Sequence, residues 1–115
     1  MQIQETHYVD NGYSFTIPAV PHRRLFSIPL LLATAPETKS KASQKLKING
    51  AVVTEAYAEG GIFNNNGALS LFTQTRCSSW IAYIEPNQTI TIQTEAWTSD
   101  GGQTPKGYTV MIGNA

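Results

Sequence analysis

A group of aromatic, acidic and amide residues in the second half of the chain has the composition of a sugar-binding site. A sugar ring has an apolar face of C–H groups that stacks on an aromatic ring, and hydroxyl edges that hydrogen-bond to polar side chains. Residues 96–107 contain three glycines and few apolar residues, which predicts a long loop that presents such groups together. The predicted ligand-binding residues are Trp97, Asp100, Tyr108, Asn64, Asn65 and Asn66.

The two tryptophans also have a structural interpretation. A buried ring contributes heavily to a β-sandwich core, so Trp97 could instead cover one end of that core. Trp80 alternates with Ala82 and Ile84, which predicts a core position.

Catalytic residues are not indicated by any motif. A glycosidase needs two carboxyl groups held about 5 to 9.5 Å apart. Glu85 and Glu95 lie at the two ends of a predicted hairpin and form the one candidate pair. The sequence contains no nucleophile elbow, phosphate loop or dinucleotide fingerprint. We therefore expect no catalytic residue, and we rank an enzyme below a binding protein.

Metal and cofactor sites are equally unsupported. His7 and Asp10 lie three residues apart, so on a strand they point to opposite faces, and His22 lies between a proline and an arginine in a predicted loop. No spacing matches a zinc or calcium site. The single Cys77 excludes an intrachain disulfide, and we interpret it as structural rather than as a thiol activated by Arg76.

The charge balance limits the partners. The chain has eight basic and eight acidic residues, a net charge of zero and a pI near 6.7, so no basic surface for nucleic acid is expected. The longest apolar run, residues 28–33, is too short to cross a bilayer, so no membrane insertion is expected. Residues 1–5 lack the basic and apolar regions of a signal peptide, which predicts synthesis in the cytoplasm without export by a leader.

Short runs of alternating apolar and polar residues, separated by turn residues, predict an all-β single domain over residues 1–115. Asn49-Gly50 fits a two-residue hairpin turn, and Pro29 predicts an edge position or a bulge within residues 25–35. Residues 37–45 are polar without an apolar stripe, which predicts a solvated loop. Residues 60–67 predict a flexible corner. The expected strands are 2–9, 13–17, 25–35, 44–48, 51–57, 68–75, 80–85, 89–95 and 108–112.

The predicted architecture is an antiparallel β-sandwich or jelly roll of eight to nine short strands. Its surface should be wetted mainly by neutral groups, because Ser, Thr, Asn and Gln make up 35 of the 115 residues while charged residues make up only 14%. Shells, fibres and adhesins often tolerate such neutral polar surfaces.

From residue 46 onward, the order of elements resembles the second half of tumour-necrosis-factor-like and complement-type globular heads. The resemblance lies in residues 46–53, 67–71, 84–92 and 107–112. The same plan is similar to the C-terminal knobs of bacteriophage tail fibres. A whole fibre carries a long shaft before its head, and this sequence has none. The chain is therefore expected to be an excised head or a complete small virion protein.

The resemblance implies a homotrimer without cofactors, whose loops contact a receptor. The favoured function is a non-enzymatic receptor-binding head at the virion or extracellular surface that recognises a cell-surface glycan or protein. One alternative is a structural virion protein, a capsid decoration or tail component that contacts only other subunits. A second alternative is a small glycan-active enzyme that uses Glu85 or Glu95.

Overall fold

The chain folds as an all-β antiparallel sandwich, which confirms the predicted fold class. The computed structural model describes residues 2–65 and 68–115, and its regular structure in these ranges is entirely β-strand. The strands are β1 (Gln2–Asp10), β2 (Phe15–Ile17), β3 (Arg24–Ala35), β4 (Lys41–Ile48), β5 (Ala51–Glu59), β6 (Gly61–Asn65), β7 (Ala68–Phe72), β8 (Gln74–Ile84), β9 (Ile90–Ser99) and β10 (Gly107–Asn114). Asn66 lies outside the described residues.

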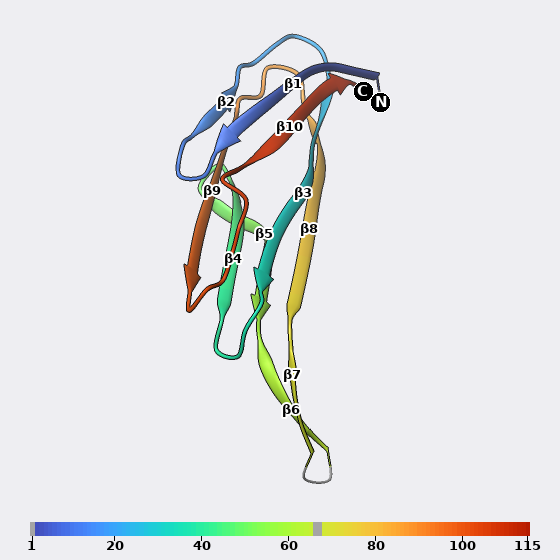
Figure 1. The fold of residues 1–115 in the computed structure, drawn as a ribbon. Helices are drawn as coiled ribbons and strands as arrows, with labels where there is room; N and C mark the ends of the chain where they lie inside the picture. The colour runs from blue at the N-terminus through green and yellow to red at the C-terminus, as the bar shows by residue number, and fades with distance from the viewer. Residues whose placement is uncertain (1, 66–67) are drawn as a thin grey trace.

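Two four-stranded sheets form the two layers (Figure 1). Sheet A has the strand order β1-β10-β3-β8, and sheet B has the order β2-β9-β4-β5. The strands pair from the outside of the sequence inward, because β1 pairs with β10, β2 with β9, β3 with β8 and β4 with β5. The hairpin of β6 and β7 is inserted in the connection between β5 and β8.

The core lies between the inner faces of the two sheets. Alternation places apolar side chains inward from nearly every strand, and burial of such side chains is the main stabilising term of the fold. The largest fully buried apolar side chains are Phe26, Ile17, Ile28, Leu31, Leu46, Ile84, Ile92 and Val110.

The predicted hairpin turn and the predicted bulge are both confirmed. Asn49 and Gly50 have φ values of 51° and 82°, the left-handed pair that a two-residue turn requires. The register of β3 against β8 shifts between Ile28 and Leu31, at Pro29, whose nitrogen has no hydrogen to donate to the ladder. A second register shift lies between β4 and β5, where Leu46 pairs with Thr54 and Lys47 with Val52, so that Val53 of β5 is left without a partner in the pairing.

Three predictions of loop structure were wrong. Strand β4 begins at Lys41, inside the segment predicted to be a solvated loop, because it pairs on both sides with β5 and β9. Strand β9 continues to Ser99 because its backbone stays paired with β4, so residues 96–99 are not part of a loop. Residues 61–65, predicted as a corner, form β6.

A buried polar network inside the sandwich depends on Gln44. Its side-chain oxygen accepts a hydrogen bond from the Leu32 amide at 3.0 Å, and its Nε2 donates to Asn11 Oδ1 at 2.9 Å and to the Gly107 carbonyl at 3.1 Å. The Thr94 hydroxyl donates to the same Asn11 oxygen at 2.7 Å. These bonds connect both sheets and the turn after β1, so a fully buried glutamine can occupy a central strand.

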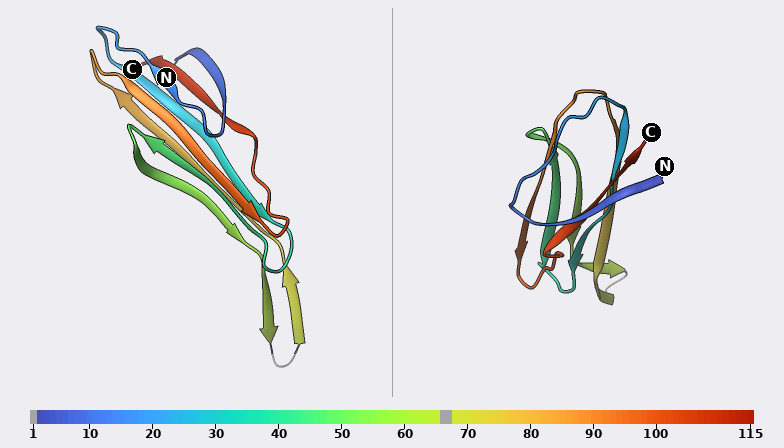
Figure 2. Two further views of the ribbon diagram at one scale, coloured as in Figure 1. Left: turned by 90° about the vertical axis from the view of Figure 1, so that its left-hand side faces the viewer. Right: turned by 90° about the horizontal axis from the view of Figure 1, so that it is seen from above.

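The hairpin of β6 and β7, here called the arm, extends beyond the end of the sandwich (Figures 1 and 2). The principal-axis extents are 63 × 24 × 21 Å and the radius of gyration is 17.2 Å. A compact domain of this length would have a radius of gyration of about 13 Å. Both chain ends lie at the opposite end of the sandwich, where Gln2 pairs with Asn114.

Candidate functional site

The outer face of sheet B, here called the charged face, is built on alternate residues of β4. Lys41, Ser43, Lys45 and Lys47 point away from the core, because the intervening Ala42, Gln44 and Leu46 point into it. Strands β5 and β9 flank β4 and place glutamates on both sides of Lys45, namely Glu55 and Glu95.

One row across this face is aromatic. Tyr57 on β5 and Trp97 on β9 both lie opposite Ser43, so the three residues form what we call the aromatic row. The ring centroids are 6.2 Å apart with an interplanar angle of 53°. Tyr57 is 38% exposed and Trp97 45% exposed, whereas Ser43 beneath them is completely buried. The two rings therefore form an accessible apolar platform over a small residue.

Polar groups surround this platform. The Tyr57 hydroxyl donates to Glu59 at 3.0 Å, and this hydrogen bond, with burial and the negative charge of Glu59, raises the Tyr57 pKa. The Ser43 hydroxyl donates to Glu55 at 2.5 Å. Glu95 forms an ion pair with Lys47, and the hydrogen bond from that ammonium lowers the Glu95 pKa. The face therefore offers carboxylate acceptors and ammonium donors within a few residues of both rings.

The arrangement has the chemistry of a carbohydrate platform. Exposed rings can stack on the C–H face of a pyranose, and the carboxylates and lysines can bond to its hydroxyl groups. A sugar bound here would be stabilised both by ring stacking and by hydrogen bonds, without a deep cavity.

The structure brings Trp97 and Asp100 to the same end of β9 but separates the other predicted site residues. Asp100 lies in the turn after β9 with a φ of 51°, and its carbonyl accepts a hydrogen bond from the buried Ser40 hydroxyl at 2.5 Å. Asn64 and Asn65 belong to β6 in the arm, and their side chains, like all of Asn66, lie outside the described parts.

Tyr108 does not belong to an exposed site. It is 2% exposed on the inner face of sheet A, and no hydrogen-bond partner of its hydroxyl is found among the described residues. Burial raises the pKa of Tyr108 to about 12. A ligand on the surface cannot reach this group, so its prediction as a binding residue is corrected.

The candidate catalytic carboxylates do not form a pair. Strands β8 and β9 belong to different sheets, so the predicted hairpin between Glu85 and Glu95 does not exist. Glu85 accepts a hydrogen bond from Arg23 at 3.0 Å, while Glu95 pairs with Lys47. Within residues 2–65 and 68–115, no group of three or more His, Cys, Asp or Glu residues could hold a metal ion.

The residues that sequence reasoning missed are Ser43, Tyr57, Glu55 and Glu59. Their period-two spacing is visible in the sequence, because Glu55, Tyr57 and Glu59 alternate as Lys41, Ser43 and Lys45 do. The register of β5 against β4 places the outward residues of the two strands side by side.

The outer face of β10, β3 and β8 in sheet A, here called the uncharged face, has a different composition. By alternation and register, no outward-facing position of β10, β3 or β8 is charged, since Arg76 lies opposite the inward-facing Ala33. Ile81 is 63% exposed, while Tyr83 and Leu30 are each 51% exposed. The large apolar residues of this face are Leu25, Leu30, Ile81, Tyr83 and Met111, and Tyr8 and Asp10 of β1 lie beside it at the edge of the sheet.

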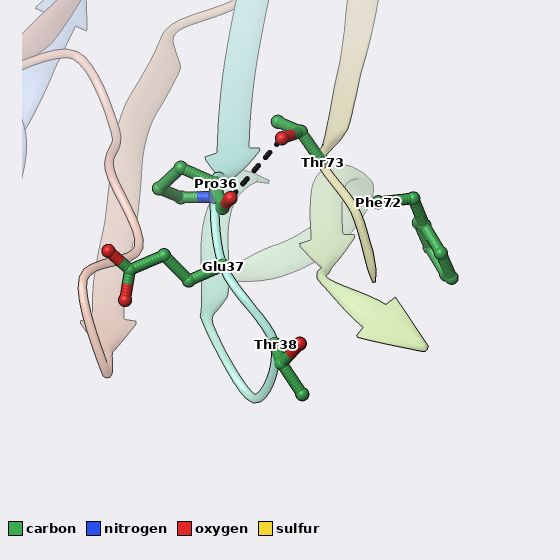
Figure 3. A pocket seen from close by; sticks show the side chains of 5 residues that line it. All are labelled: Pro36, Glu37, Thr38, Phe72 and Thr73. Carbon is green, nitrogen blue, oxygen red and sulfur yellow. Dashed lines mark hydrogen bonds between the residues drawn. The ribbon is translucent and has the colours of Figure 1, made fainter. Parts of the chain in front are cut away.

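An open cavity of about 370 Å³ lies at the base of the arm, lined by Pro36, Glu37, Thr38, Phe72 and Thr73. Figure 3 shows the Thr73 hydroxyl directed at the Pro36 carbonyl, to which it donates at 3.2 Å, while the Phe72 ring points away. The cavity has a single carboxylate, that of Glu37.

None of the described segments is a helix long and apolar enough to cross a membrane. No family model matches the sequence, and no curated protein matches it.

Proposed function

We propose that the chain is a non-enzymatic binding head that recognises a cell-surface carbohydrate through the aromatic row. The observation that carries this proposal is the pair of exposed rings, Tyr57 and Trp97, held over the buried Ser43. Exposed aromatic residues with nearby hydrogen-bonding groups suit a ligand that has both an apolar face and polar edges. The recognition surface is then a sheet face rather than the loops.

We also propose that the sandwich is a jelly roll of the tumour-necrosis-factor-like or phage-knob type. The outside-in pairing of the strands supports this, because a long hairpin rolled into two sheets produces such an order. On this view the arm is an insertion between the fifth and sixth strands of the roll. The neutral polar composition supports a place on the outside of a virion.

A homotrimer is part of the same proposal. On β10, β3 and β8 the uncharged face carries large exposed apolar residues and no charged residue at an outward position, and such faces are usually covered by another subunit. The charged face would remain outside the trimer and accessible to a receptor.

The test is carbohydrate binding by the purified chain with Trp97→Ala, measured on a panel of envelope polysaccharides and glycans. Loss of stacking should weaken binding about 10- to 100-fold. Trp97→Phe keeps a ring and should retain most of the affinity. Tyr13→Ala removes a 69% exposed ring outside the aromatic row and serves as the control. Equal binding by Trp97→Ala and the parent chain would refute the proposed site.

A structural virion protein is the second candidate, favoured by the arm and by the uncharged face. It predicts no carbohydrate affinity in any variant. A glycan-active enzyme has less support, because Glu85 and Glu95 engage separate cations.

A further inference from the structure

The arm is an uncharged segment that the sandwich does not cover. No charged residue occurs between Glu59 and Arg76. The register places Ile62 opposite Leu71, and β6 and β7 pair with no strand of sheets A and B. An isolated two-stranded hairpin is at best marginally stable in water, so an arm of this composition is expected to pack against another surface.

The base of the arm is fixed on both strands. The Gly60 amide donates to the Ser40 carbonyl at 3.0 Å, and a Cβ at Gly60 would lie 1.9 Å from the Glu37 carbonyl oxygen. On the other strand, the Gln74 side chain accepts a hydrogen bond from the Glu59 amide at 2.9 Å. Together with the Thr73 bond to Pro36, these contacts direct the arm away from its own sandwich (Figure 2).

The same chain carries a surface of matching chemistry. On β10, β3 and β8 the uncharged face exposes Leu30, Ile81 and Tyr83 and has no charged residue at an outward position, while the Arg23 guanidinium beside Tyr83 is paired with Glu85. An uncharged arm placed there would leave no charge buried without a partner, because Arg23 and Glu85 pair with each other, whereas on the charged face it would cover lysines and glutamates.

We propose that the arm of one copy packs on the uncharged face of a second copy. This inference rests on the proposed homo-oligomer and specifies its interface. The contact joins two different surfaces, and such a contact builds a ring when the rotation between successive copies closes; a threefold rotation gives the proposed trimer. The arm then supplies the cover that each uncharged face lacks.

Two single substitutions test the two sides of the contact. Phe72→Lys places a charge on the arm, where Phe72 is 43% exposed, and Ile81→Lys places one on the uncharged face. Each should raise the dissociation constant of the oligomer about 100-fold, measured by light scattering over a dilution series, because an unpaired lysine would be buried. Val52→Lys alters a 52% exposed position on β5 and should leave the mass unchanged. An oligomer that persists in either test variant would overturn the proposal.

Mixing the two variants separates an arm-to-face contact from symmetric contacts. The Ile81→Lys chain keeps an intact arm and the Phe72→Lys chain keeps an intact face, so the mixture should form a complex of one chain of each. Symmetric arm-to-arm and face-to-face contacts predict no complex, and its absence would overturn the proposal. Circular dichroism confirms that each variant keeps its β fold.

Carbohydrate binding by single chains of these variants distinguishes the two proposals. Variants that dissociate but still bind carbohydrate support the arm contact and the aromatic row separately. A parent chain that is monomeric at all concentrations overturns the arm contact and the trimer, whereas loss of binding in Trp97→Ala would still support the carbohydrate site.

Discussion

The two outer faces of the sandwich share one core but differ in the placement of charge. On the charged face, β4 presents lysines at alternate positions, and β5 and β9 present glutamates beside Lys45. On the uncharged face, apolar residues such as Ile81 and Tyr83 occupy the corresponding outward positions. Both faces carry exposed aromatic rings, so the contrast lies in the groups around the rings.

The contrast shows how a chain with few charges distributes them. Charged residues make up 14% of the sequence, and those of strands β4, β5 and β9 keep sheet B hydrated around Tyr57 and Trp97. Hydrated rings remain available to a soluble ligand. Rings in an uncharged apolar surface favour a partner that removes the whole surface from water. The overall composition of the chain does not reveal this difference in charge between the two faces.

The largest expected effect weakens the hydrogen bonds that join the two sheets and therefore destabilises both faces together. Gln44→Ala leaves the Leu32 amide, Asn11 Oδ1 and the Gly107 carbonyl each without one hydrogen bond, and it creates a cavity. We expect a loss of about 3 kcal/mol in the free energy of unfolding, measured by denaturant titration. Gln93→Ala removes a half-buried glutamine that makes, among the described residues, a single side-chain hydrogen bond, to the Gly12 carbonyl, and is the matched control, expected to lose much less stability.

Equal stabilities of the Gln44→Ala and Gln93→Ala variants would show that the buried network does not hold the sheets together. The midpoint and the slope of the titration should be read together, because a change in slope would indicate a change in the denatured state instead.

Substituting one tyrosine on each face has a smaller expected effect and tests directly whether the two faces have different functions. Tyr57→Ala should weaken carbohydrate binding about tenfold and leave the oligomer intact, because Tyr57 stands beside Trp97 on the charged face. Tyr83→Ala should weaken the oligomer by a similar factor and leave binding per chain unchanged. Tyr83 lies on the uncharged face, with the Arg23 guanidinium 3.6 Å from its ring centroid.

If both tyrosine variants lose carbohydrate binding, or if both lose the oligomer, the two faces do not have separate functions. Light scattering and carbohydrate binding should therefore be measured on the same samples, at concentrations above and below dissociation of the parent oligomer.

The hairpin at Asn49-Gly50 could be predicted from sequence, but the aromatic row could not. Counting outward from the turn without interruption would pair Tyr57 with Ala42, on the inner face. The register shift between Leu46 and Lys47 moves Tyr57 opposite Ser43 and therefore outward. A bulge depends on packing against the neighbouring strand, so local turn residues do not reveal it.

The polar start of β4 escaped prediction for a related reason. Residues 41–43 precede the expected strand 44–48, and Ser43 is fully buried without being apolar, so the hydrophobic pattern indicates a loop there. Strand β4 is central in sheet B, and its polar side chains are satisfied by Glu55, Asn11 and backbone groups far away in the sequence. Pattern analysis detects apolar burial but not long-range hydrogen bonding. The apolar strands β3 and β10 were predicted with nearly the observed bounds.

The smallest expected effect concerns Tyr108, directly beneath the uncharged face. Its buried hydroxyl finds no partner among the described residues, so Tyr108→Phe should raise the free energy of unfolding by about 1 kcal/mol at neutral pH. Burial raises the folded-state pKa to about 12, against about 10 in the unfolded chain. Between these values the unfolded state loses a proton that the folded state keeps, so stability falls as pH rises from 10 to 12.

Tyr108→Phe removes this contribution, and its stability advantage over the parent chain should therefore grow between pH 10 and 12. Chemical denaturation of both chains across that range measures the difference, in which the titration of the other tyrosines and lysines cancels. A constant difference would show that solvent reaches the Tyr108 hydroxyl. The inner side of sheet A would then be as open to water as the charged face, contrary to a dry core beneath a surface that a second copy covers.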